Sequence, residues 1–165
     1  MSAPGATQLH VVQLSTCRRT GQPSVVLEDA AHARWLAFYL PANEANRLSR
    51  CLGAGPRTCS PIYELVEQLV RGLDARVVRV ELDCDDDGVS ACLVLDRDGS
   101  TASLGCHPAD AMALAIRAGA PIVATPAAMA RARPVADLLR SGDLPAGADA
   151  DGLARWLERV SPSDF

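Results

Sequence analysis

Three apolar runs joined by two tight turns fill the middle of the chain and restrict what it can fold into. The runs read ARVVRVELD, VSACLVL and TASLGC, and the turns between them read CDDDG and DRDGS. An Asp-Gly pair is favoured in the tight turns that join antiparallel strands. Residues 75–106 therefore predict two consecutive hairpins, which favours an antiparallel sheet over a repeating βαβ arrangement.

Further strands are predicted on both sides of this meander. Runs rich in apolar and β-branched residues lie at 8–14, 24–28 and 34–40, and APIVAT supplies a short strand at 120–125. Each run is separated from the next by polar residues, glycine or proline, which are typical of turns and loops. The chain thus alternates between pairs of strands and single helices.

Helix start and stop signals flank two segments before the meander. Residues 41–52 begin with Pro41 and end before Gly53, as expected for a helix. The next helix follows Ser60, a favourable N-cap, with Pro61 at its first position. An apolar stripe runs along this second helix through Ile62, Leu65, Val66, Leu69, Val70 and Leu73.

Length and composition favour one soluble domain. The 165 residues suffice for a single hydrophobic core, and 48% of them are hydrophobic while 22% are charged. We predict an α+β fold with a largely antiparallel or mixed sheet and several packed helices over residues 1–135, followed by a short helical tail at 136–165. The sequence shows neither a membrane-spanning run nor a secretion signal, so the cytoplasm is the expected location.

Charge and cysteine usage limit the classes of function. The net charge is −4, which argues against binding nucleic acid by overall attraction, because such binding depends on basic residues that displace counterions. All 16 basic residues are arginine, whose planar fork suits phosphate. The six cysteines form no CxxC pair, so they indicate neither a zinc knuckle nor a disulfide scaffold and are expected to be mostly small buried hydrophobes.

The acidic turn DCDDDG resembles the first half of a calcium-binding EF-hand loop. Asp83, Asp85, Asp87 and Gly88 occupy the expected positions. The twelfth position, however, holds Val94 instead of a bidentate glutamate, and the flanking runs predict strands rather than helices. We therefore interpret this segment as a solvated hairpin turn.

The stretch GCHPADAMALAIRAGAPI places polar residues at the start of an apolar helix. Pro108 fits the first helical position, which makes His107 the N-cap, and Gly119 fits a left-handed C-cap. Asp110 then lies in the first turn, where a carboxylate is favoured by the helix dipole. Capping explains all of these residues, but a helix start can also hold a phosphate beside an acid or base.

The order of these segments resembles the bifunctional nuclease domain family. The resemblance runs from about Gly21 to Ala124 through GQPSVVL, RWLAFYLPANEANRL, GPRT, YELVEQLVRGLDARVVRVELD, DDG and HPADAMALAIRAGAPIVA. Members of the family are compact, self-associating α+β proteins, and some cut both RNA and DNA. The resemblance therefore implies a nuclease that acts on nucleic acid and forms a homo-oligomer, expected to be a dimer.

Several polar positions depart from the family pattern. The family usually has Asp-Ala-Arg before the proline and serine after it, whereas this chain keeps only the proline and Asp110 and has His107 directly before the proline. The usual His-Asp pair on the second helix becomes Tyr63-Glu64, while Glu44 on the first helix matches.

The resemblance implies metal-assisted hydrolysis of phosphodiesters with magnesium or manganese. The implied roles are catalysis by Asp110, His107, Glu44 and Glu64, metal binding by Asp110 and Glu44, and substrate binding by Arg57 and Tyr63. In this hypothesis the ion activates water, and His107 acts as acid or base because histidine titrates near neutral pH. The altered positions favour an alternative, in which a catalytically degenerate family member acts as a dimeric binding or regulatory module.

Overall fold

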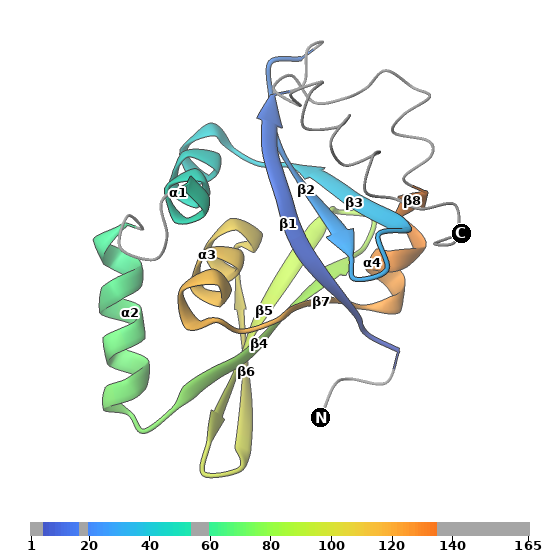
Figure 1. Cartoon of the computed structure of the whole chain (residues 1–165). Coiled ribbons are helices and arrows are strands. Elements are labelled where there is room, and N and C mark those ends of the chain that lie inside the picture. The colour runs from blue at the N-terminus through green and yellow to red at the C-terminus, as the bar shows by residue number, and fades with distance from the viewer. Residues whose placement is uncertain (1–4, 17–19, 54–59, 135–165) are drawn as a thin grey trace.

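A computed structural model describes residues 5–16, 20–53 and 60–134, which form one sheet covered by helices (Figure 1). The strands are, in chain order, β1 (Thr7–Thr16), β2 (Pro23–Asp29), β3 (Arg34–Tyr39), β4 (Arg76–Cys84), β5 (Val89–Arg97), β6 (Ser100–Cys106), β7 (Ile122–Ala124) and β8 (Arg133–Pro134). The helices are α1 (Ala42–Gly53), α2 (Pro61–Gly72), α3 (Pro108–Ala118) and α4 (Pro126–Ala130).

The sheet is mixed but mostly antiparallel, which confirms the predicted α+β class. Its strand order is β6-β5-β4-β7-β1-β2-β3-β8, and every neighbouring pair is antiparallel except β4 and β7. The predicted meander is present as β4-β5-β6. Asp98 and Gly99 both take positive φ in the turn between β5 and β6, as expected for a tight hairpin turn. The predicted C-terminal tail at 136–165 lies outside the described residues.

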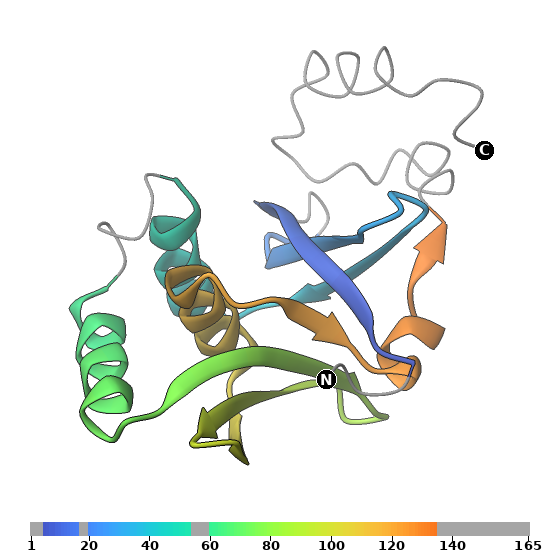
Figure 2. The same ribbon diagram turned by 60° about the horizontal axis from the view of Figure 1, so that its bottom comes forward.

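The three long helices, α1, α2 and α3, lie together on one side of the sheet (Figure 2). The short α4 lies apart from them, after β7. α3 is central, because it packs against α1, α2, β4 and β5. Most of its buried residues are alanine, and Ala109, Ala111, Met112, Ala113 and Ala115 are fully buried. Small side chains let a helix approach its neighbours closely, so the start of α3 is held in a fixed place against α1 and α2.

The apolar stripe predicted on α2 is only partly covered. Tyr63 is buried and Val66 packs against the core, whereas Ile62, Leu65 and Leu69 are each exposed by at least half. The pattern therefore predicted the helix correctly, yet it did not show which of its apolar residues the body of the protein covers.

The acidic turn is a hairpin turn, as predicted. It joins β4 to β5, and the carboxylate of Asp85 accepts hydrogen bonds from the backbone amides of Asp87 and Gly88. The cysteines differ in part from expectation. Cys51 is buried but disulfide-bonded, while Cys84, Cys92 and Cys106 are free and only half-buried. Disulfide pairing depends on spatial proximity, which cysteine spacing alone did not indicate.

No helix in the described ranges is both long and apolar enough to cross a membrane.

Candidate functional site

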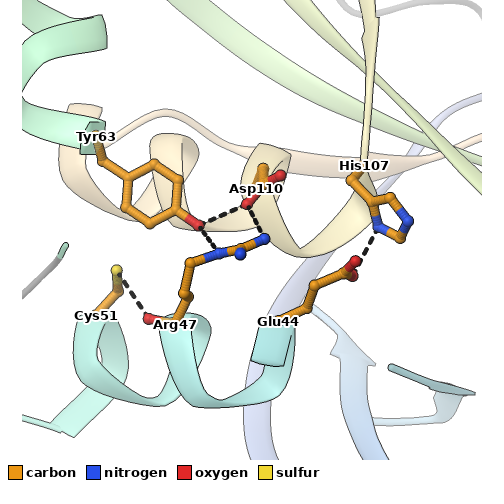
Figure 3. Close-up of polar contacts among 6 residues, drawn as sticks. All are labelled: Glu44, Arg47, Cys51, Tyr63, His107 and Asp110. Carbon is orange, nitrogen blue, oxygen red and sulfur yellow. Dashed lines mark hydrogen bonds and ion pairs between the residues drawn. The ribbon is translucent and has the colours of Figure 1, made fainter. Parts of the chain in front are cut away.

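The first turn of α3 begins as the sequence predicts. His107 is the N-cap, Pro108 occupies the first helical position and Gly119 closes the helix with a left-handed φ of 63°. The His107 side chain, however, makes no capping hydrogen bond to the helix backbone. The His107 side chain therefore does not cap the helix, and the polar side chains at this end contact α1 and α2 instead (Figure 3).

One contact is an ion pair between α1 and the α3 N-cap. Glu44 lies in the first turn of α1, and its Oε2 is 2.8 Å from Nδ1 of His107. The side chain of Glu44 is 10% exposed and that of His107 is 52% exposed. Oε2 is buried without a hydrogen bond of regular geometry, and Nδ1 of His107 is the polar atom that it faces. A buried carboxylate is costly without a partner, and this contact with the imidazole offsets that cost.

The second group links all three long helices through Asp110. Tyr63 Oη donates a hydrogen bond of 2.6 Å to Asp110 Oδ1, and Arg47 Nη2 donates one of 3.1 Å to the same oxygen. Arg47 Nε also donates to Tyr63 Oη at 3.3 Å. Each of these residues thus contacts both of the others, and the first turns of α2 and α3 are fixed relative to α1.

Burial and hydrogen bonding change the pKa values within this second group. Burial, followed by the hydrogen bond to Asp110, raises the pKa of Tyr63 to about 12. The hydrogen bond with Tyr63, together with the charge of Asp110, raises the pKa of Arg47. Tyr63 therefore stays a neutral donor and Arg47 stays a cation throughout the physiological range.

The sequence prediction named four of these five residues. Glu44, Tyr63, His107 and Asp110 come together at the start of α3, whereas Arg47 was missed. Arg47 follows Glu44 by three positions, a spacing that places both on one face of α1 and was a usable signal.

The remaining predicted residues lie elsewhere. Glu64 is on the exposed surface of α2, because adjacent helical residues point about 100° apart and Tyr63 is the one turned inward. Arg57 lies outside the described residues. Tyr63 is only 3% exposed, so its hydroxyl serves Asp110, and direct contact with a substrate stays a prediction.

The donor set at this site does not fit a resident metal ion. Asp110 Oδ1 already accepts two hydrogen bonds, one of them from the Arg47 guanidinium, which would compete with a cation. Glu44 Oε2 faces His107. Within the described ranges, no three His, Cys, Asp or Glu side chains are grouped to hold a metal. No chemical step is therefore derived through a metal, and metal binding by Asp110 and Glu44 rests on the family resemblance alone.

The arrangement can transfer protons and hold an anion. Nδ1 of His107 faces the buried carboxylate, and Nε2 points away from Glu44 (Figure 3). Arg47 uses Nε and Nη2 inside the site, but a guanidinium carries five N–H donors, so others remain for a phosphate. The α3 dipole adds positive potential at the same place.

Comparison with known protein families gives a match. Residues 25–136, more than half of the chain, match the family described as "Bifunctional nuclease domain". Glu44, Arg47, Tyr63, His107 and Asp110 all lie within the matched range. No curated protein matches the chain.

Proposed function

The chain belongs to the bifunctional nuclease domain family, and on that premise we propose that it hydrolyses phosphodiester bonds of DNA and RNA at the start of α3. The observation that carries the proposal is the pair formed by Glu44 and His107. A buried carboxylate holds one nitrogen of an imidazole whose side chain is 52% exposed, so the other nitrogen is available to a substrate. This is the arrangement that general acid–base catalysis requires.

His107 and Glu44 supply the proton transfer in this proposal. Nε2 of His107 takes a proton from a water molecule while the water oxygen attacks phosphorus. The bond from phosphorus to the leaving oxygen breaks, and that oxygen takes a proton from solvent. Glu44 fixes the imidazole orientation and stabilises the imidazolium that forms, because its carboxylate is 2.8 Å from Nδ1.

Arg47 and the α3 dipole stabilise the phosphate. Both place positive charge where negative charge develops on the phosphate oxygens. Asp110 and Tyr63 act as positioning residues, since their hydrogen bonds fix the Arg47 guanidinium against α3. The net charge of −4 makes this local positive potential important, because the molecule as a whole does not attract nucleic acid.

A nuclease assay tests the proposal directly. Full-length protein is incubated with labelled single- and double-stranded DNA and RNA, with magnesium, with manganese and with chelator. We expect cleavage that His107→Asn reduces by about 10²–10⁴-fold, the usual contribution of a general acid or base. Cleavage that persists in His107→Asn, purified in the same way, would be contamination or another site, and the assignment would be wrong.

His32→Asn is a matched control for this assay. His32 also pairs with a glutamate, Glu28, at 2.8 Å, and its side chain is 61% exposed, but it lies in the turn between β2 and β3. Its φ is 54°, a left-handed conformation that asparagine tolerates. We expect this variant to cleave as the wild type does. Equal losses in both histidine variants would show that the effect is not specific to the α3 site.

One observation favours a non-catalytic alternative. The family resemblance implies a catalytic and metal-binding role for Asp110, but its Oδ1 already accepts hydrogen bonds from Arg47 and Tyr63, and this leaves that role unfilled. The chain would then keep the family fold as a dimeric binding or regulatory module. Absence of cleavage on all substrates and in all metal conditions, together with measurable binding of nucleic acid, would support this alternative over the nuclease.

A further inference from the structure

α2 carries a row of apolar side chains that the described part of the chain leaves open to solvent. Ile62, Leu65 and Leu69 are each at least half exposed, and so is Leu73 at the C-cap. Their spacing of three or four residues places them on one face of the helix, and we call this row the α2 stripe. Figures 1 and 2 show α2 as the outermost of the three long helices. The α2 stripe therefore lies on an outer surface of the protein.

The other large apolar residues that are exposed do not form a row. They belong to four different elements, β1, β3, α1 and β6, and are Val12, Tyr39, Leu52 and Leu104. Single exposed apolar residues are normal on a protein surface, whereas a contiguous apolar patch indicates an interaction surface. A row at helical spacing suits a second helix, because the ridges of one helix pack into the grooves of another. Among the described elements, the α2 stripe is therefore the surface that best fits another helix.

A segment with the matching pattern follows the described residues in the sequence. Residues 151–160 read DGLARWLERV, in which Leu153, Trp156, Leu157 and Val160 recur at helical spacing. A helix of about ten residues is marginal in water by itself, and most helices are stabilised by the packing of their apolar face. A helix formed by this segment therefore requires an apolar surface. The segment lies beyond the match to the family, which covers residues 25–136, so such a contact would be a feature of this chain rather than of the matched domain.

We propose that residues 151–160 form a helix that packs antiparallel on the α2 stripe of the same chain. Ile62 and Leu69 are seven positions apart, about 10 Å along a helix. Leu153 and Val160 have the same separation, so the two apolar rows match in length. The antiparallel order sets Leu153 beside Leu69, and at the other end it sets Val160 beside Ile62. The packing would cover the apolar side chains of both rows, which water otherwise surrounds.

Charge supports this occupant and its orientation. Glu64 is exposed on the polar side of the α2 stripe. The arginines of α2 and α3 are Arg71 and Arg117, and both pair with Glu67. Glu64 therefore has no basic partner on these two helices. The antiparallel order places Arg159 beside Glu64, so the proposed helix supplies the opposite charge at the border of the apolar contact.

The connecting chain is long enough for the segment to reach its own α2. The described structure ends at Pro134 in β8, which lies on the other side of the molecule from α2 (Figure 1). Residues 135–150 span about 50 Å when extended. A domain of this size has a radius of gyration of only about 14 Å. Because the segment is attached to the same chain, its effective concentration at α2 is high, which favours this occupant over a second molecule.

The proposed contact stabilises a helix that contributes to the candidate site. α2 carries Tyr63, whose hydroxyl contacts Asp110 and Arg47. A helix packed on the outer face of α2 would hold it against α3, and so would help to position Tyr63. The inference goes beyond the proposed function and does not need it, because the packing is measured without any substrate.

Tryptophan fluorescence of the full chain tests the packing. The protein has two tryptophans, Trp35 and Trp156, so Trp35→Phe leaves Trp156 as the only reporter. We expect its emission to be shifted to the blue and its quenching by acrylamide to be several-fold weaker than in the same protein unfolded in urea. Adding Leu65→Gln and Leu69→Gln should shift the emission to the red. A Trp156 emission equal to that of the unfolded protein would overturn the proposal, as would an emission that the α2 substitutions leave unchanged.

Val12→Gln and Leu104→Gln are matched controls. Both residues are apolar and about as exposed as those of the α2 stripe, but they lie on β1 and β6. We expect neither substitution to change the Trp156 emission. A red shift in either control as large as that of the α2 variant would show that the segment packs elsewhere. The emission should also be independent of protein concentration, and a red shift on dilution would show that the segment comes from a second molecule, contrary to the proposal.

A charge exchange tests the antiparallel orientation. Glu64→Arg sets two cations side by side at the border of the contact, and we expect a partial red shift of the Trp156 emission. Adding Arg159→Glu restores opposite charges and should reverse the shift. A double variant that stays as red-shifted as Glu64→Arg would contradict this orientation.

A second measurement applies if Trp35→Phe does not fold. The emission of the wild type minus that of Trp156→Phe gives the spectrum of Trp156 without any change at Trp35. We expect the same blue-shifted spectrum. A difference spectrum like that of the unfolded protein would overturn the packing.

Discussion

Two groups of polar side chains meet at the start of α3, and they differ in where their atoms point. In the Glu44–His107 pair, one partner is buried and the other is half exposed, and the imidazole has one nitrogen facing Glu44 and one pointing away from it. In the Arg47–Tyr63–Asp110 group, each residue contacts both others. The first arrangement suits proton exchange with a substrate, whereas the second holds three helices in place.

The comparison teaches that charge alone does not identify the reactive residue. Asp110 matches the family pattern, yet its contacts are internal and shared with two donors. His107 departs from that pattern, but it combines exposure with a buried carboxylate partner. We therefore expect variants of the pair to change activity most, whereas variants of the Arg47–Tyr63–Asp110 group should act mainly through stability.

The largest effect is expected for His107, where the loss of activity and the loss of stability can be measured separately. The variant His107→Asn should lose cleavage by about 10²–10⁴-fold, while the buried Glu44 loses its contact with Nδ1 and the free energy of unfolding falls by about 1–3 kcal/mol. Adding Glu44→Gln removes that buried charge, so the double variant should recover stability without recovering activity. Urea denaturation and the nuclease assay measure the two effects. Recovery of activity in the double variant would contradict proton transfer by His107.

Alkaline unfolding tests whether Tyr63 belongs to the internal group. Its pKa is raised to about 12 from 10.0, first by burial and then by the hydrogen bond to Asp110. Since the folded state keeps the proton longer, this stabilisation is complete below pH 10 and is lost as pH rises from about 10 to about 12. The loss should be about 2–3 kcal/mol in the wild type and absent in Tyr63→Phe. Parallel pH profiles for both proteins would contradict the buried phenol.

The sequence predicted the position of the site better than its contacts. Proline and glycine placed the start and end of α3 correctly, because these residues act through the local backbone. Capping by His107 was a reasonable interpretation of the same residues. The observed partner, Glu44, comes from α1, and no local pattern shows which helix will lie beside that N-cap.

Contacts between helices, which local sequence patterns do not show, also explain the exposed apolar residues of α2 and the missed role of Arg47. The period of apolar residues predicted α2, but exposure of Leu65 and Leu69 depends on how far the helix stands from its neighbours. The spacing of three residues indicates that Arg47 lies on the same face of α1 as Glu44. Its role required Tyr63 and Asp110 to converge from two other helices, which is a property of the tertiary fold.

Neutralising Asp110 should weaken the fold more than the chemistry. Asp110→Asn keeps an oxygen that accepts from Tyr63 but removes the charge that Arg47 contacts at 3.1 Å. We expect the free energy of unfolding to fall by about 1.5–3 kcal/mol, the usual value for hydrogen bonds to charged groups. Cleavage should fall less than in His107→Asn. A loss of activity equal to that of His107→Asn, with unchanged stability, would instead place Asp110 in the chemistry.

The smallest effect concerns the shape of the Arg47 side chain. Arg47 donates from Nε to Tyr63 and from Nη2 to Asp110, and both bonds depend on its planar fork. The variant Arg47→Lys keeps the positive charge but cannot make both bonds in this geometry, so we expect a loss of about 0.5–1.5 kcal/mol in the free energy of unfolding. Arg97→Lys, at the exposed end of β5, is the matched control and should change stability by less. If both variants unfold at the same urea concentration as the wild type, the group is held by charge alone, and its contrast with the Glu44–His107 pair disappears.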